Sequence, residues 1–214
     1  MAVFSIKQVL GRSWELMRSR FWFLVLLYLG IGIVLAVLGF AEQGLRENVP
    51  VLATIISIVS TVLNLILGLG SMQVMLQICK GNQGAVADLW QPLPQFFKFL
   101  GASILYGLIV FVGMMLLVVP GIICMIRFQF FGYLIVDKHM GPIEALKKSF
   151  AMTRGSSWNL VGLNLSLTAI NIVGVLCLIL GLFVSIPLTS LAAALVYLIL
   201  LTAAETNPSQ PSAA

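Results

Sequence analysis

The sequence predicts an all-α, polytopic membrane protein with six transmembrane helices arranged as three hairpins. Hydrophobic residues make up 60% of the 214 residues and charged residues only 9%, with a mean hydropathy of +1.09. Soluble domains carry roughly 25% charged residues, so this chain has too few polar groups to cover a soluble surface. Long uncharged runs alternate with short charged segments that join them, and the lengths of the uncharged runs give the number of spans. We therefore interpret residues 1–204 as a single membrane domain.

The first 20 residues are expected to form a cytoplasmic, interfacial amphipathic helix. Ser5 and Gln8 have the spacing of a capping box, in which both side chains bond N–H groups at the helix start. Apolar side chains then recur on one face and charged ones lie elsewhere, as in helices that lie on a membrane surface. The uncharged run 21–40 follows as span one, because it can cross a core of roughly 30 Å and is too long for a cleaved signal peptide.

Span two, residues 51–77, carries a seam of small and polar side chains at steps of three and four. The seam consists of Thr54, Ser57, Thr61, Asn64, Gly68 and Ser71. In lipid, such seams let helices approach closely and hydrogen-bond to one another. We interpret the seam as a packing surface, with the lining of a polar pathway as the alternative.

Spans three and four follow from chain length. Residues 99–136 would form a helix of about 57 Å, nearly twice the hydrocarbon thickness, so the chain must reverse within them. Pro120 and Gly121 are the only pair of helix breakers in this interval, and they predict a structural turn between spans 99–119 and 121–136. The same arithmetic divides the last apolar region near 181–187 into spans 158–181 and 186–203.

The distribution of basic residues predicts the orientation. Ten of the 12 Lys and Arg residues fall in joints on the side of the N-terminus, and only Arg46 falls in a joint on the other side. The positive-inside rule therefore places both termini in the cytoplasm. The tail 205–214 is short, polar and contains proline, so we expect it to be disordered.

Composition also limits the partners. The net charge is +5 and the pI about 9.4, but the basic residues are thinly spread and none cluster with aromatics, so we expect no nucleic acid. Anionic lipid headgroups at the inner leaflet are the expected partner. Cys79, Cys124 and Cys177 lie in apolar runs without the spacing of metal ligands. Neither a metal nor a cofactor is predicted.

Arg127 is the most unusual residue, because it lies about 9 Å beyond Gly121 inside a predicted span. A central arginine costs about 2.5–3.5 kcal/mol, so it must face protein, water or a lipid phosphate. Its predicted partners form a polar stripe on span five: Asn164, Thr168 and Asn171. With Arg127 they form a candidate lipid or anion contact. The alternative is an arginine that joins spans four and five or reaches the outer headgroups.

The joint after span four holds Asp137 and His139, which we interpret as a solvated turn because their spacing is poor for a shared site. An amphipathic helix is predicted over 142–154, with Pro142 at its first position and Gly155 as its C-terminal cap. Its apolar face, with Ile143, Leu146 and Phe150, is expected to rest on the inner leaflet.

The segments VVPGII and YLIVDKHMGPIEALKKSFAMTRGSSW, on either side of Arg127, carry a family resemblance. They resemble the second half of the YciC-like bacterial inner-membrane proteins and, more distantly, the membrane domains of glycerophosphoryl diester phosphodiesterases. The shared pattern maps to Pro120, Gly121, Asp137, Ala145, Ser149 and Trp158. The resemblance covers residues 99–200 and implies a six-span protein of the bacterial inner membrane without an established activity. The catalytic domain of those phosphodiesterases has no counterpart in this sequence.

The expected function is that of a non-enzymatic integral membrane protein, which acts through lipids or a membrane-protein partner in envelope or membrane homeostasis. The alternative is a small-solute or lipid transporter or channel, with a pathway lined by spans two and five. An intramembrane enzyme is disfavoured because no nucleophile and base can be paired. The oligomeric state does not follow from the sequence.

Overall fold

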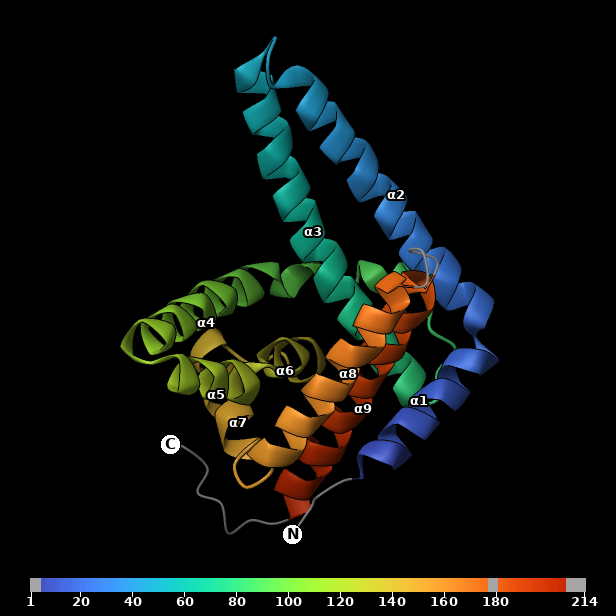
Figure 1. Cartoon of the computed structure of the whole chain (residues 1–214), viewed down its shortest axis with the longest axis vertical. Coiled ribbons are helices and arrows are strands. Elements are labelled where there is room, and N and C mark those ends of the chain that lie inside the picture. Colours follow the sequence, from blue (N-terminus) through green and yellow to red (C-terminus); the bar gives the residue numbers. More distant parts are fainter. Residues whose placement is uncertain (1–4, 177–180, 207–214) are drawn as a thin grey trace.

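The computed structural model describes residues 5–176 and 181–206, and every regular element in these ranges is helical, which confirms the predicted all-α class. The elements, shown in Figure 1, are α1 Ile6–Ser19, α2 Phe21–Leu45, α3 Pro50–Cys79, the short 3-10 helices η1 Val86–Leu89 and η2 Leu93–Gln95, α4 Phe96–Leu116, α5 Val118–Phe128, α6 Phe131–Lys138, α7 Pro142–Met152, α8 Ser157–Leu176 and α9 Leu182–Thr206.

Five helical stretches in the described part are long and apolar enough to cross a membrane, which identifies a multi-pass membrane protein. They are Phe21–Leu45, Pro50–Cys79, Val86–Leu116, Ser157–Leu176 and Leu182–Thr206. The remaining predicted span, span four over 121–136, is not a single helix. It is divided between α5 and α6, whose 11 and 8 residues correspond to about 16 and 12 Å.

The division between α5 and α6 has a local cause in α7. The fully buried Ser149 accepts a hydrogen bond from the N–H of Phe130 at 3.3 Å and donates to the carbonyl of Arg127 at 2.9 Å. Thr153 donates to the same carbonyl at 3.2 Å. These two hydroxyls satisfy backbone groups at the break, which in a continuous helix would bond to the helix itself.

The predicted turn at Pro120 and Gly121 is wrong in position. The chain reverses at Leu117, which is extended with φ −164° and ψ 140°, and both residues lie in the first turn of α5. Proline is tolerated there because the first N–H groups of a helix have no intrahelical acceptor. A Cβ on Gly121 would lie 2.5 Å from Cγ and 2.8 Å from the backbone N of Met114, so this glycine permits close packing of α5 on α4.

Both predicted amphipathic helices bury part of their apolar faces against protein. Val9, Ser13 and Met17 of α1 are buried, and α1 packs mainly along α9. Ser5 is the N-cap of α1 but makes no side-chain capping bond, so the predicted capping box does not form.

Helix α7 begins at Pro142 as predicted and ends at Met152, two residues before the predicted end. Its inward face packs on α6 and α4 and buries Leu146, whereas Ile143 of the predicted membrane-facing set is 60% exposed. Gly155 lies beyond the last helical residue with φ +89°.

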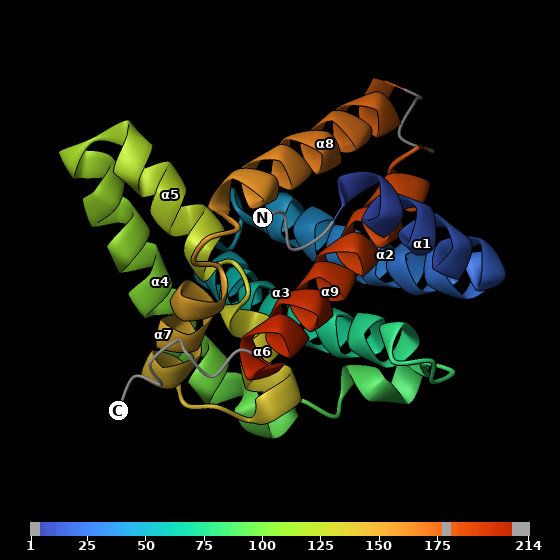
Figure 2. The same cartoon turned by 90° about the horizontal axis from the view of Figure 1, so that it is seen from below.

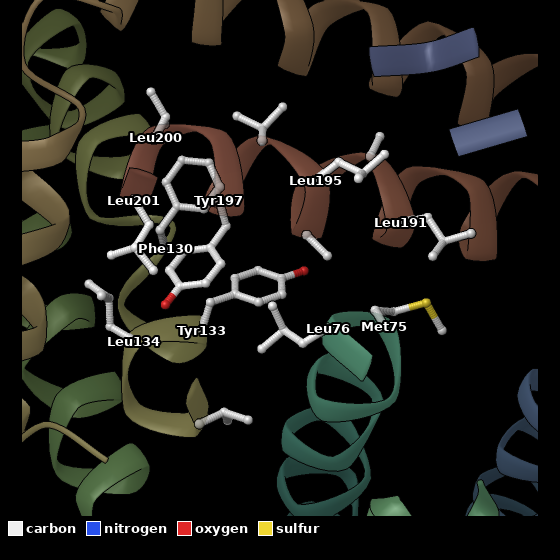
Figure 3. Close-up of a cluster of buried hydrophobic side chains, with 14 of the residues drawn as sticks. Met75, Leu76, Phe130, Tyr133, Leu134, Leu191, Leu195, Tyr197, Leu200 and Leu201 are labelled. Carbon is white, nitrogen blue, oxygen red and sulfur yellow. The ribbon is translucent and has the colours of Figure 1, made fainter. Parts of the chain in front are cut away.

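The core lies where α9, α6 and the second half of α3 meet (Figure 3). All six residues from Phe131 to Val136 are buried. In α9, 56% of the most apolar stretch is buried, against 11–17% in the other four candidate spans. Helix α9 is therefore the central helix of the protein.

Away from this core, the pairs α2–α3, α4–α5 and α8–α9 extend in different directions (Figures 1 and 2). We call the parts of these helices that lie away from the core the outer helix halves. Large apolar side chains are exposed along them, among them Ile58, Leu108, Phe111 and Val173. Because the pairs diverge, the structure does not align them along one membrane normal.

Helix α8 ends at Leu176 and α9 begins at Leu182, so Pro187, which was predicted near the turn, lies inside α9. Helix α9 continues to Thr206, and the rest of the predicted disordered tail lies outside the described residues, as does Cys177. Cys79 and Cys124 are free and half-buried.

Candidate functional site

Asp137, in the last turn of α6, makes polar contacts with two other elements. One carboxylate oxygen forms an ion pair with Lys80 at the end of α3, and the other accepts a hydrogen bond of 3.0 Å from the phenol of Tyr197 in α9. The Asp137 side chain is only 7% exposed. A carboxylate at the C-terminal end of a helix is disfavoured by the helix dipole, so both partners are needed to stabilise its charge.

His139 follows directly, in the left-handed conformation with φ 54° and ψ 26°. Residues other than glycine seldom adopt this conformation, and they do so where surrounding contacts hold them. The amide of Gln95 lies 2.7 Å from the Nδ1 of the ring, and Lys98 donates to the backbone carbonyl of His139 at 3.0 Å. The start of α4 and the end of α6 are joined by these two bonds.

These residues border an open polar pocket of about 270 Å³. Its lining comprises Gln73, Leu76, Gln77, Lys80, Gln91, Pro92, Gln95, Val136, Asp137 and His139. Gln73 donates to Gln91 at 3.0 Å, and Gln91 donates to Asp88 at 2.7 Å. The amide oxygen of Gln95 is buried and has no partner among the described residues.

The pocket has the chemistry of a binding site for a small polar group that carries a hydrogen-bond donor. Asp137 is fully committed to Lys80 and Tyr197, so its carboxylate clamps three helices together rather than acting as a free base. In the described ranges, no group of three or more His, Cys, Asp or Glu residues is arranged to hold a metal ion.

Arg127 lies at the end of α5, beside the break that Ser149 stabilises. Its Nε donates to the hydroxyl of Ser157 at 3.4 Å, and its guanidinium carbon stands 4.5 Å from the ring centre of Phe150. None of the ion pairs between described residues includes Arg127. The guanidinium is held by a hydroxyl and an aromatic face, and it keeps donors for an anion.

The hydrogen bonds of the Arg127 side chain do not include its predicted partners on span five. Asn164 donates to Gln129 at 3.0 Å, and the described hydrogen bonds of Arg127 include neither Asn164, Thr168 nor Asn171. Thr168 is exposed. The amide oxygen of Asn171 is buried without a partner among the described residues. No hydrogen bond between described residues therefore joins the stripe to Arg127.

Sequence reasoning missed the contacts of Asp137 because its partners are distant in the chain. Lys80 lies 57 residues before it and Tyr197 lies 60 residues after it. One signal was available: a tyrosine in an apolar span usually needs a partner for its hydroxyl, and carboxylates at the ends of spans are natural acceptors.

Comparison with known families gives a family for this chain but no activity. The chain belongs to the DUF7847 family, a domain of unknown function. The family pattern matches residues 84–213, which include Gln95, Arg127, Asp137, His139 and Tyr197 and leave α1, α2 and α3 outside. No curated protein and no solved structure matches the chain.

Proposed function

We propose that this DUF7847 protein is a non-enzymatic integral membrane protein that acts through lipids or a membrane-protein partner, as an accessory of envelope or membrane homeostasis. The observation that carries the proposal is the exposure of apolar side chains along the outer helix halves, such as Leu108 at 58% and Val173 at 58%. Surfaces of this kind need lipid or a protein partner to cover them. By contrast, the nearly buried carboxylate of Asp137 is engaged in structural contacts.

The proposal includes six crossings, with α5 and α6 together forming the fourth, over 121–136. It also includes a bacterial inner-membrane location with both termini cytoplasmic. Charge supports this orientation, since Arg46 lies between α2 and α3 at the far end of that pair, away from the other joints (Figure 1). The basic residues assigned to the cytoplasmic side are Lys7, Arg12, Arg18, Arg20, Lys80, Lys98, Lys138, Lys147, Lys148 and Arg154.

The resemblance of residues 99–200 to YciC-like proteins supports the same location. Ser149 belongs to the shared pattern and stabilises the α5–α6 break, so the pattern has a structural basis in this chain. The resemblance brings no catalytic residue with it.

Native mass spectrometry of gently extracted, full-length protein tests this proposal. We expect bound phospholipid, a partner protein, or both, to remain with the protein at defined stoichiometry. Recovery of a bare monomer from several mild detergents would contradict the proposal. A matched preparation of an unrelated six-span protein controls for lipid that detergent fails to remove.

Transport along spans two and five is the alternative, and the contacts of α3 weigh against it. Thr54 and Thr61 are exposed, and each donates to a carbonyl of its own helix, at 2.9 and 2.8 Å. Asn64 is also exposed. The buried, unpartnered oxygen of Asn171 is the observation that favours a polar pathway. Solute flux in proteoliposomes that is abolished by Asn171→Leu would support transport over the favoured proposal.

A further inference from the structure

A cavity of about 360 Å³ lies between α1 and α9 and shares no lining residue with the Asp137 pocket. Its lining comprises Ser5, Gln8, Val9, Arg12, Cys79, Leu195, Leu198, Ile199 and Thr202. Val9 and Leu195 are buried and form an apolar floor, while Leu198 and Ile199 form an apolar wall from α9. One side of the cavity is therefore suited to hydrocarbon.

The opposite side is polar and carries positive charge. Ser5, Gln8 and Arg12 are spaced by three and four residues, so they lie along one face of α1. None of their side chains takes part in a hydrogen bond or an ion pair between described residues. The acidic residues in those ion pairs are Glu42, Asp137 and Glu205, and each pairs with a basic residue other than Arg12. All three side chains keep hydrogen-bond donors available.

The start of α1 adds to this donor set. The first N–H groups of a helix have no intrahelical acceptor, and the helix dipole places partial positive charge there. Because Ser5 makes no capping bond, its hydroxyl does not neutralise this end. An anionic group in the cavity gains the guanidinium of Arg12, the hydroxyl of Ser5 and the positive end of a 14-residue helix.

We infer that this cavity binds an anionic phospholipid, with its phosphate at Arg12 and an acyl chain along Leu198 and Ile199. The apolar wall distinguishes a phospholipid from free phosphate, which gains nothing from hydrocarbon contact. The lining contains no acidic residue, so it offers nothing to the ammonium group of a zwitterionic lipid. The inference deepens the proposed function, on which it rests, by naming a lipid class and its site.

Binding of phosphatidylglycerol to the full-length protein in mixed micelles, followed by native mass spectrometry, tests the inference. Arg12→Gln removes the proposed phosphate ligand, while Lys7→Gln removes an exposed charge of α1 that does not line the cavity. We expect Arg12→Gln to weaken binding by about fivefold or more, the loss expected for one charge-assisted contact, and Lys7→Gln to leave it unchanged.

A second variant keeps the test independent of charge. Ile199→Trp places a larger side chain in the apolar part of the cavity and leaves Arg12 unchanged. This variant should also retain less phosphatidylglycerol. Size-exclusion profiles identify any variant that fails to fold. Phosphatidylcholine and inorganic phosphate serve as competitors, and neither should displace phosphatidylglycerol at equal concentration.

Several results overturn the inference. Equal binding by wild type and Arg12→Gln rejects the site, and equal competition by phosphatidylcholine or inorganic phosphate rejects the lipid class. Retained lipid that is insensitive to Arg12→Gln leaves the proposed function intact. A wild-type protein that retains neither lipid nor partner contradicts the proposed function itself.

Discussion

The central helix α9 and the outer helices α2 and α3 are all strongly apolar, but they meet different neighbours. Helix α9 has 56% of its most apolar stretch buried, whereas α2 and α3 have 11%. Near the middle of α9, Ala192 and Ala194 are fully buried, and such small residues let helices approach closely. Apolarity therefore marks a candidate span, while residue size and polar partners decide whether that span packs inside the protein.

Polar groups differ between the two regions in the same way. In the core they connect separate helices, as Tyr197 does with Asp137 and Ser149 does with the backbone at Arg127. In the outer half of α3, Thr54 and Thr61 bond only to their own helix. Hydrogen bonds between helices therefore fix the arrangement of the core, and the outer halves lack this constraint.

The largest expected effect comes from truncating one leucine in the core and comparing it with the same truncation in an outer helix half. Leu134 in α6 is fully buried and Leu108 in α4 is 58% exposed. We expect Leu134→Ala to lower the free energy of unfolding by about 2–5 kcal/mol through cavity formation. Leu108→Ala should stay within about 0.5 kcal/mol, as for exposed sites. Denaturant titration in micelles measures both, and equal losses would contradict the division into two regions.

A smaller effect is expected for a serine at the α5–α6 break. Ser149→Ala leaves the N–H of Phe130 without its partner and should cost about 1–3 kcal/mol. Ser166→Ala is the control, because that hydroxyl bonds only to the carbonyl of Gly162 in its own helix. The same titration compares the two variants. If both behave alike, the break does not depend on α7.

The smallest effect concerns close packing within an outer pair. Gly121→Ala brings a Cβ within 3 Å of the Met114 backbone, and α4 and α5 must separate at a cost of about 1–2 kcal/mol. Gly107→Ala meets nothing within 4 Å and should be neutral or stabilising, because alanine favours the helix. Proteolysis rates of the α4–α5 connection in micelles provide the readout. Identical rates for the two variants would show that the outer pair tolerates separation.

The class of the protein and the need for a reversal after α4 follow from composition and chain length. The position of the reversal does not, because proline is acceptable in the first turn of a helix and Gly121 serves a helix contact. The break after Arg127 depends on Ser149, which is 22 residues away. No local pattern shows that contact in a single sequence.

The candidate site was predictable only in part. Arg127 was identified as unusual from its place in an apolar run, but its partners come from α7 and the start of α8. Helical spacing showed that Asn164, Thr168 and Asn171 share a face, but not which helix lies opposite. The Asp137 contacts required the packing of α3, α6 and α9, which periodicity does not specify.

The central claim is that the outer helix halves face lipid. The most direct test places single spin labels at Ile58, Leu108 and Val173 of a cysteine-free protein in liposomes, with a label at the exposed Gln91 as the aqueous control. Electron paramagnetic resonance then compares collisions with oxygen, which concentrates in lipid, and with a water-soluble nickel complex. The account predicts that oxygen dominates at the three outer positions and nickel at Gln91. Dominant nickel collisions at the outer positions would contradict it.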